Sequence, residues 1–378
     1  MSDAARPAAD ASEVPSSGAS VRWSPAAPYL AALALAGAVM LAGAVLGSRA
    51  VGAAGILLAL AVPLLFVALR VRPTSRARRR VGTVLVPFTL FLVFVGAKVT
   101  SHEAGLAVPD WPLSYGRLMP PMVGNIFYEH GHRMVATAVG MCTLVLALWT
   151  ARADARRWVR TLGLACLGAV VLQGLLGGIT VIFLLPLPVS VAHGTLAQTF
   201  LCLVTWLAYA TSLEWDALGR SGAAAPARAA ARRAAPLVAI ATGAIWIQLV
   251  LGALVRHAGA GLAVPFFPVS ATGAWWPDVV DRDVLLHLSH RGFGLVVVAL
   301  VAWATLSVAR RVASLRRHAL GVLALVIAQF ALGAPVVLVR RAPTPTSVHV
   351  VTGAALLALT WWLVLRLWRR GHAPEARA

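Results

Sequence analysis

The stretch YEHGHRM, residues 128–134, places a carboxylate, two imidazoles and a guanidinium where a polar loop runs into an apolar segment. The stretch LHLSHRG, residues 286–292, repeats the His-Arg pair in the second half of the chain, again where an apolar segment starts. Ionisable groups at the edge of a membrane are costly to desolvate, so a cluster of them there indicates a functional site. The repetition predicts a duplicated membrane protein.

Composition supports this interpretation. Of the 378 residues, 60% are hydrophobic and only 12% are charged, which is too apolar for a soluble domain and indicates an all-α integral membrane protein. The net charge of +20 would suggest a nucleic-acid partner on a soluble fold, but here the basic residues lie in short loops between apolar runs, so no nucleic acid is expected. Cys142, Cys166 and Cys202 lie in apolar segments without metal-binding or redox spacing, which disfavours a disulfide framework or zinc site.

A membrane-spanning helix needs about 20 mostly apolar residues, and by this measure the sequence predicts ten. They cover residues 28–47, 51–70, 81–100, 132–150, 159–184, 190–213, 236–256, 285–309, 318–339 and 347–367. Basic runs follow every second segment, so the positive-inside rule predicts a multi-pass protein with these loops and both termini in the cytoplasm. The long loops at 101–131 and 257–284 are then expected on the outer side.

The two outer loops belong to an internal repeat. Residues 96–109 contain GAKVT and then GLAVP, and residues 252–265 contain GALVR and then GLAVP in the same register. Further along, Gln173 and Gln329 each stand 20 residues before a histidine. The repeat predicts two pseudo-symmetric four-helix bundles preceded by an extra N-terminal two-helix hairpin. The expected order is a disordered cytoplasmic tail (1–27), the accessory hairpin (28–80), the N-terminal bundle (81–213), a cytoplasmic linker (214–235), the C-terminal bundle (236–367) and a cytoplasmic tail (368–378).

Four histidines recur with this repeat. His132 and His193 stand 61 residues apart in the first unit, and His290 and His349 stand 59 apart in the second, each expected at the outer start of a helix. Alternate helices of a four-helix bundle run parallel, so the two imidazoles of a pair are expected at one depth, facing each other across the bundle core. That arrangement suits the axial positions of a haem iron. The alternative is that each histidine is a satisfied polar group at the membrane surface. The remaining histidines are expected to be mostly solvated.

Glu129 makes the two units different, because its counterpart three residues before the helix histidine is His287. A partly desolvated carboxyl group one turn from an axial ligand can relay protons, which predicts chemistry in the first unit and a permanently bound haem in the second. The alternative is a carboxylate stabilised by the helix macrodipole. Arg133 and Arg291 are candidate partners of haem propionates, or anchors that extend to the membrane surface.

Taken together, these features resemble the haem A synthase family, and the match covers residues 81–367. It is carried by Glu129-x-x-His132-Arg133, His193, His290-Arg291, His349 and the loop at 105–113. The resemblance implies oxidation of the methyl group of haem O to the formyl group of haem A, by successive hydroxylations and loss of water, for cytochrome oxidase biogenesis. It also implies a bacterial plasma membrane protein with haem sites near the outer face. In that family pattern His290 and His349 hold a haem b cofactor, His132 and His193 face the substrate haem, and Glu129 is catalytically required.

One departure from the family concerns cysteine. Many members carry a cysteine pair in the first outer loop, where this sequence has Val108 and Ser114, and the second loop has Val264 and Ser270. The chain is therefore expected to be a cysteine-less variant, in which no thiol in these loops passes electrons or binds substrate.

Partners and alternatives follow from the same features. The expected partners are haem O, the lipid bilayer, haem O synthase and an electron donor, either a quinol or a redox protein, because no flavin or nicotinamide fingerprint is present. Self-association as a homo-oligomer stays open. A dihaem b-type electron-transfer protein would also explain the four histidines, but it leaves Glu129 without a role. A haem transporter or chaperone would need a polar path across the membrane, and the helix centres carry no charged residues to line one.

Overall fold

The structure is a computed structural model that describes residue 70 and residues 73–268 and 273–376. The tail predicted at 1–27 and the segment predicted at 28–47 lie outside the described residues, as does the segment at 51–70 apart from its last residue. The two helices of the predicted accessory hairpin, which would bring the number of spanning helices to ten, therefore lie almost entirely outside the described residues.

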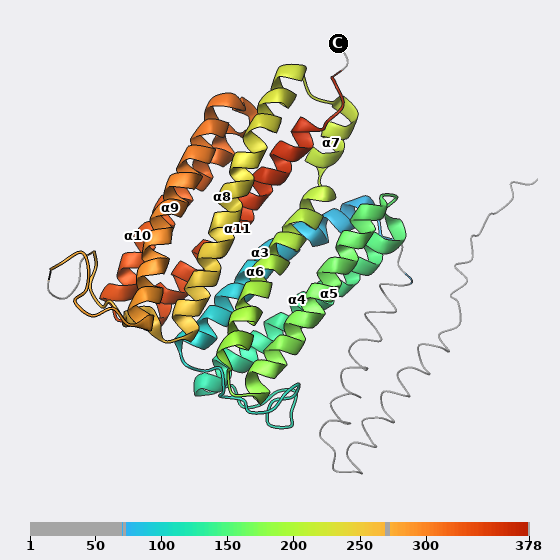
Figure 1. The fold of residues 1–378 in the computed structure, drawn as a ribbon. Helices are drawn as coiled ribbons and strands as arrows, with labels where there is room; N and C mark the ends of the chain where they lie inside the picture. The colour runs from blue at the N-terminus through green and yellow to red at the C-terminus, as the bar shows by residue number, and fades with distance from the viewer. Residues whose placement is uncertain (1–69, 71–72, 269–272, 377–378) are drawn as a thin grey trace, which may run out of the picture. The chain divides into compact units, whose positions relative to one another are not determined.

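The described residues form helices, with no β-strand among them beyond isolated bridges. Eight helices are long and apolar enough to cross a membrane, which supports a multi-pass membrane protein (Figure 1). They are α3 (Ser75–Ser101), α4 (Gly124–Ala153), α5 (Arg157–Ile182), α6 (Leu187–Ala210), α8 (Ala225–His257), α9 (Arg282–Arg311), α10 (Arg316–Leu338) and α11 (Pro343–Gly371). A short helix, α7 (Leu213–Ser221), and two 3₁₀ turns, Ala260–Leu262 and Ala313–Leu315, complete the set.

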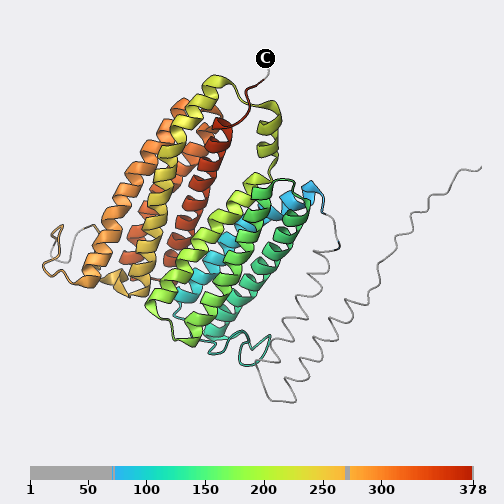
Figure 2. The same ribbon diagram turned by 45° about the vertical axis from the view of Figure 1, so that its right-hand side comes forward.

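Each helix packs on its neighbour in sequence within two sets. Helices α3, α4, α5 and α6 contact one another in order, with α3 also contacting α6. Helices α8, α9, α10 and α11 do the same, with α8 also contacting α11. The sets meet because α11 packs on α3 and α6, and α6 packs on α8; Figures 1 and 2 show the sets side by side.

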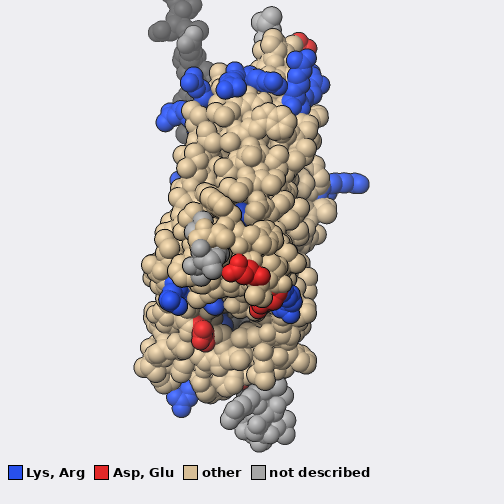
Figure 3. Space-filling view, turned by 60° about the vertical axis from the view of Figure 1, so that its left-hand side comes forward, with Lys and Arg blue, Asp and Glu red and all other residues tan. Residues whose placement is uncertain are grey.

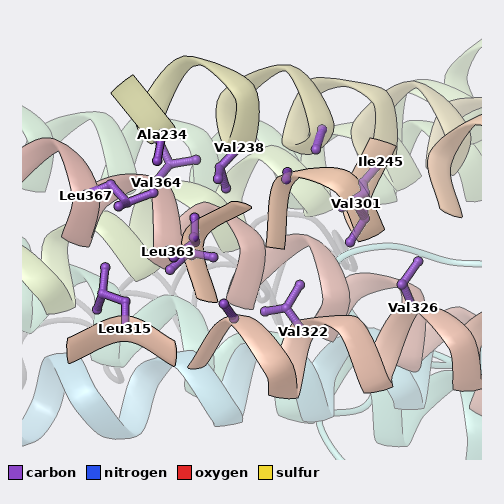
Figure 4. Close-up of a cluster of buried hydrophobic side chains, with 14 of the residues drawn as sticks. Ala234, Val238, Ile245, Val301, Leu315, Val322, Val326, Leu363, Val364 and Leu367 are labelled. Atoms are coloured by element: carbon purple, nitrogen blue, oxygen red, sulfur yellow. The ribbon is translucent and has the colours of Figure 1, made fainter. Parts of the chain in front are cut away.

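Buried aliphatic side chains fill both sets. In the second set, Val238, Val301, Leu315 and Leu363 are fully buried (Figure 4). Alanines share this cluster, and small side chains let membrane helices approach closely where lipid gives no hydrophobic drive to associate. The first set has its own cluster, which also takes in two alanines of α11, Ala354 and Ala358.

Several helices extend beyond their predicted apolar windows. Helix α4 begins at Gly124 where 132 was predicted, and α8 begins at Ala225 where 236 was predicted. The apolar window measures the length needed to cross lipid, whereas a helix continues into the polar region wherever its side chains find partners. For the same reason the predicted linker at 214–235 contains α7, whose N-cap Ser212 accepts a hydrogen bond from the Trp215 N–H, and the first turns of α8.

Charge is distributed unevenly between the two ends of the helices. In Figure 3 most of the visible Lys and Arg side chains lie at the upper end. The long loops at 102–123 and 258–281, the latter described except for residues 269–272, lie at the opposite, lower end in Figures 1 and 2. The predicted histidines therefore lie nearer the end of the helices that carries the long loops than the end rich in Lys and Arg.

Candidate functional site

Each of the four matched histidines faces a glycine on the helix that precedes its own. The pairs are Gly96 with His132, Gly177 with His193, Gly252 with His290, and Gly333 with His349. A Cβ atom added at Gly96 would lie only 2.9 Å from Cε1 of His132, and one added at Gly252 would lie 3.1 Å from Cε1 of His290. At Gly96, Gly177 and Gly252 the missing side chain thus lets the imidazole lie against the neighbouring helix backbone, whereas the contact at Gly333 is looser.

His132 and His290 lie further from the first residue of their helices than the sequence predicted. His132 was expected to begin a helix, but α4 begins at Gly124, two turns earlier, and His290 lies equally far into α9. The preceding turns stay helical because they carry buried groups that bind the outer loops. The expectation of a helix-start position was therefore wrong.

The histidines come together in the predicted pairs. His132 and His193 are half-buried and close enough to interact electrostatically, and the same holds for His290 and His349. In the described part of the chain, Nδ1 of His132, of His193 and of His349 is buried without a hydrogen-bond partner. Such nitrogens are present on both histidines of the first pair and on one of the second, and imidazole nitrogens are donors that a haem iron accepts, so these residues fit such a group. Within that part no three His, Cys, Asp or Glu side chains form a metal-binding cluster.

Glutamine side chains hold three of the four histidines. Gln248 Nε2 donates to the backbone carbonyl of His290 at 2.8 Å and lies 3.2 Å from its Nδ1. Gln173 Nε2 donates to the His193 carbonyl at 3.0 Å and lies 3.3 Å from its Nε2. Such outer partners fix the orientation of a ligand ring.

Gln329 completes this group, with its Nε2 3.4 Å from Nε2 of His349. Sequence reasoning used Gln173 and Gln329 only as markers of the repeat and missed Gln248. The signal that would have found it is Gln-x-x-x-Gly, which occurs before Gly177, Gly252 and Gly333.

Glu129 and Arg133 bind the first outer loop. Glu129 is only 4% exposed; its Oε2 accepts a hydrogen bond from the Val108 N–H at 2.7 Å, and its Oε1 pairs with Arg133 at 2.5 Å. Arg133 also donates to the carbonyls of Val108, Asp110 and Leu113 at 3.0, 2.6 and 2.9 Å. We call this set the first clasp; it holds the loop against α4.

His287 and Arg291 form a second clasp on the other loop. His287 Nδ1 lies 3.3 Å from the Val264 nitrogen and its Nε2 lies 3.1 Å from Arg291 Nε, and a neutral ring accepts from one of these two donors. Arg291 also donates to the Val264 carbonyl at 2.7 Å. His287 and His130, which were expected to be solvated, are both buried, and His130 Nδ1 lies 2.7 Å from the Ser114 hydroxyl. That expectation was wrong because both imidazoles satisfy polar groups of the outer loops.

Asp110 stabilises the first loop from within. Burial raises the pKa of this carboxyl, but hydrogen bonds from the Gly116 and Tyr115 backbone N–H groups, at 2.7 and 2.6 Å, and the nearby Arg133 charge bring the pKa below its ordinary value. The group therefore stays ionised at neutral pH and keeps the turn at 110–116 closed.

Two hollows in the described part of the chain lie elsewhere. One of about 280 Å³ is lined by residues such as Arg232 and Trp368, and one of about 460 Å³ by residues such as Arg78 and Arg220. Neither contains a predicted site residue.

Comparison with known proteins gives a consistent result. The COX15-CtaA family model, described as cytochrome oxidase assembly protein, matches residues 79–361. A haem A synthase of Symbiobacterium thermophilum is 34% identical over 275 residues, which cover 68% of this chain and 85% of that protein. A haem A synthase of Shouchella clausii is 28% identical over 302 residues, covering 77% of this chain and 97% of that protein. One of Methylobacterium radiotolerans is 32% identical over 250 residues, covering 61% and 66% respectively.

Proposed function

Because this chain belongs to the COX15-CtaA family of cytochrome oxidase assembly proteins, we propose that it is a haem A synthase, a membrane oxidoreductase that converts the methyl group of haem O into the formyl group of haem A. The observation that carries this proposal is the arrangement of four half-buried histidines in two pairs, each imidazole set against a glycine. The similarity to three haem A synthases supports it.

The two pairs are given different roles. His290 and His349 would hold a haem b cofactor, and His132 and His193 would bind the iron of the substrate haem. Bound in this way, a haem supplies the electron-transfer and oxidative chemistry that amino-acid side chains lack. The protein contributes the ligands, their orientation and the apolar helices that exclude water.

Glu129 is assigned to the chemistry of the first half. It lies one helical turn before His132 and is held by the Val108 N–H and Arg133. A carboxyl group there can hold or move a proton beside the substrate, whereas the matching His287 gives the second half no carboxylate. Its hydrogen bonds also make it a positioning group for the loop, so both roles end when it is removed.

Arg133 and Arg291 are proposed mainly as loop anchors. In the described residues the four hydrogen bonds of Arg133 engage its two terminal nitrogens, which leaves the Nε N–H for a haem propionate. A propionate contact would therefore be made at the edge of the guanidinium that faces away from the loop carbonyls.

The architecture and orientation are proposed from the same features. Bundles at 81–213 and 236–367 would be related by pseudo-symmetry, which is supported by the matching clasps and glycine contacts. The basic end and both termini would face the cytoplasm, with the haem sites near the outer face of a bacterial plasma membrane. Haem O synthase and a quinol or redox protein would supply substrate and electrons.

The test is to identify the haems bound to the purified protein, made in cells that also make haem O. Extraction and chromatography should give haem b together with haem O, a hydroxylated intermediate or haem A. Two equivalents of haem b and nothing else would contradict the proposal and favour a dihaem electron-transfer protein.

A further inference from the structure

The glutamine support described above is missing at one of the four histidines. Gly177, Gly252 and Gly333 each follow a glutamine by one helical turn, but Gly96 follows Leu92. Leu92 lies in α3 at the position that Gln248 occupies in α8, four residues before the glycine that faces the histidine. An apolar side chain thus replaces an amide in the first half only.

The consequence is visible in the contacts of the histidines. Gln248 and Gln173 each bind both the backbone carbonyl and a ring nitrogen of their histidine. His132 has no such glutamine partner among the described residues. Leu92 packs instead on the apolar cluster of the first helices.

We infer that Leu92 makes His132 the least constrained of the four haem ligands, so that the haem held by His132 and His193 leaves the protein most readily. This inference rests on the proposed function, in which that haem is substrate and product and must exchange, whereas the other must stay. Gln248 and Gln329 act as positioning residues that hold the cofactor ligands His290 and His349, whereas of the two substrate-haem ligands only His193 has such a partner, Gln173. Removing a hydrogen-bond partner of a metal ligand typically costs roughly 10–100-fold in affinity, enough to separate an exchangeable haem from a resident one.

The experiment follows haem release from the purified full-length protein in detergent. Apomyoglobin in excess serves as the haem acceptor, and the released haems are separated by chromatography. Leu92→Gln should slow the release of haem O or haem A by roughly tenfold and leave haem b unchanged. Leu92→Met, of similar length but without a donor, is the matched control and should behave as the wild type.

The reciprocal change is made at the matching position of the second half. Gln248→Leu should release haem b roughly tenfold faster. The low-spin ferric electron paramagnetic resonance signal of the substrate haem should also shift in Leu92→Gln, because that signal depends on the orientation of the imidazole planes. A merely structural role for residue 92 would leave this signal unchanged.

Several results would overturn the inference. Wild-type release of haem O and haem A from Leu92→Gln would do so, as would unchanged retention of haem b by Gln248→Leu. If Leu92→Gln does not fold, Gln173→Leu tests the same haem from its other ligand: roughly tenfold faster release supports the inference, and an unchanged rate contradicts it. A wild-type protein that carries haem b alone would instead count against the proposed function.

Discussion

Adding one methyl group opposite His132 should displace that imidazole, whereas the same change opposite His349 should not. The Cβ of Gly96→Ala would lie 2.9 Å from Cε1 of His132. Non-bonded carbons prefer about 3.5 Å or more, so the ring must move by about 0.6 Å. At Gly333 the added Cβ would lie 3.6 Å from Cε1 of His349, which is already an ordinary contact.

That displacement is large for a ligand. Functional constellations need positions held within about 0.5 Å, so Gly96→Ala should weaken retention of the substrate haem by roughly 10–100-fold and reduce haem A formation. Gly333→Ala is the matched control. It should keep both haems and, because alanine favours a helix over glycine by about 0.5–1 kcal/mol, should unfold at the same or a higher temperature.

The assay is the haem content per polypeptide after chromatography, measured together with the thermal unfolding midpoint in detergent. A Gly96→Ala protein with the wild-type complement of both haems would refute the reasoning. So would a Gly333→Ala protein that folds but has lost haem b.

Three further changes test other parts of the molecule. Glu129→Ala should leave haem b bound but abolish haem A formation, and full turnover by this variant would contradict a proton role. His290→Ala should lose haem b, read from haem absorbance per polypeptide, and retention would reassign the ligand. Asp154 pairs with Arg78 and Arg156 at 3.0 and 2.9 Å. Burial raises the pKa of this carboxyl, but the hydrogen bonds from Arg156 and Arg78 bring the pKa below its ordinary value. The stability it contributes is therefore present above about pH 4 and lost as the pH falls further. Asp154→Asn should lower the free energy of unfolding at pH 7 by roughly 1.5–3 kcal/mol and flatten the acid dependence of the unfolding midpoint, and a wild-type pH profile would argue against this pairing.

The eight described spanning helices could be predicted because crossing lipid imposes a length and a composition that are legible in the sequence. The pairing of His132 with His193 was also predictable, because the repeat placed both on parallel helices of one unit. These two features depend on patterns that extend over whole segments.

The clasps were not predictable from the same patterns. Glu129 and His287 were recognised as counterparts. Their contacts with a loop N–H could not be predicted, because these contacts depend on where the loop backbone lies. Gln248 was missed because the first unit served as the template for the repeat, and that unit has Leu92 at the matching place. A residue that occurs in only one copy of a repeat is not detected when the other copy is used to search for matching positions.

The contacts of α11 affect the order in which the protein can be assembled. Helix α11 packs on α3 and α6 as well as on α8, and its alanines Ala354 and Ala358 enter the apolar cluster of the first helices. About 130 residues separate the end of α6 from the start of α11, which at about 5–20 residues per second is a delay on the order of ten seconds during synthesis. Throughout that interval the faces of α3 and α6 on which α11 packs are without that helix. A ribosome that stalls before Pro343 would therefore leave a fragment whose inserted helices still expose a binding surface.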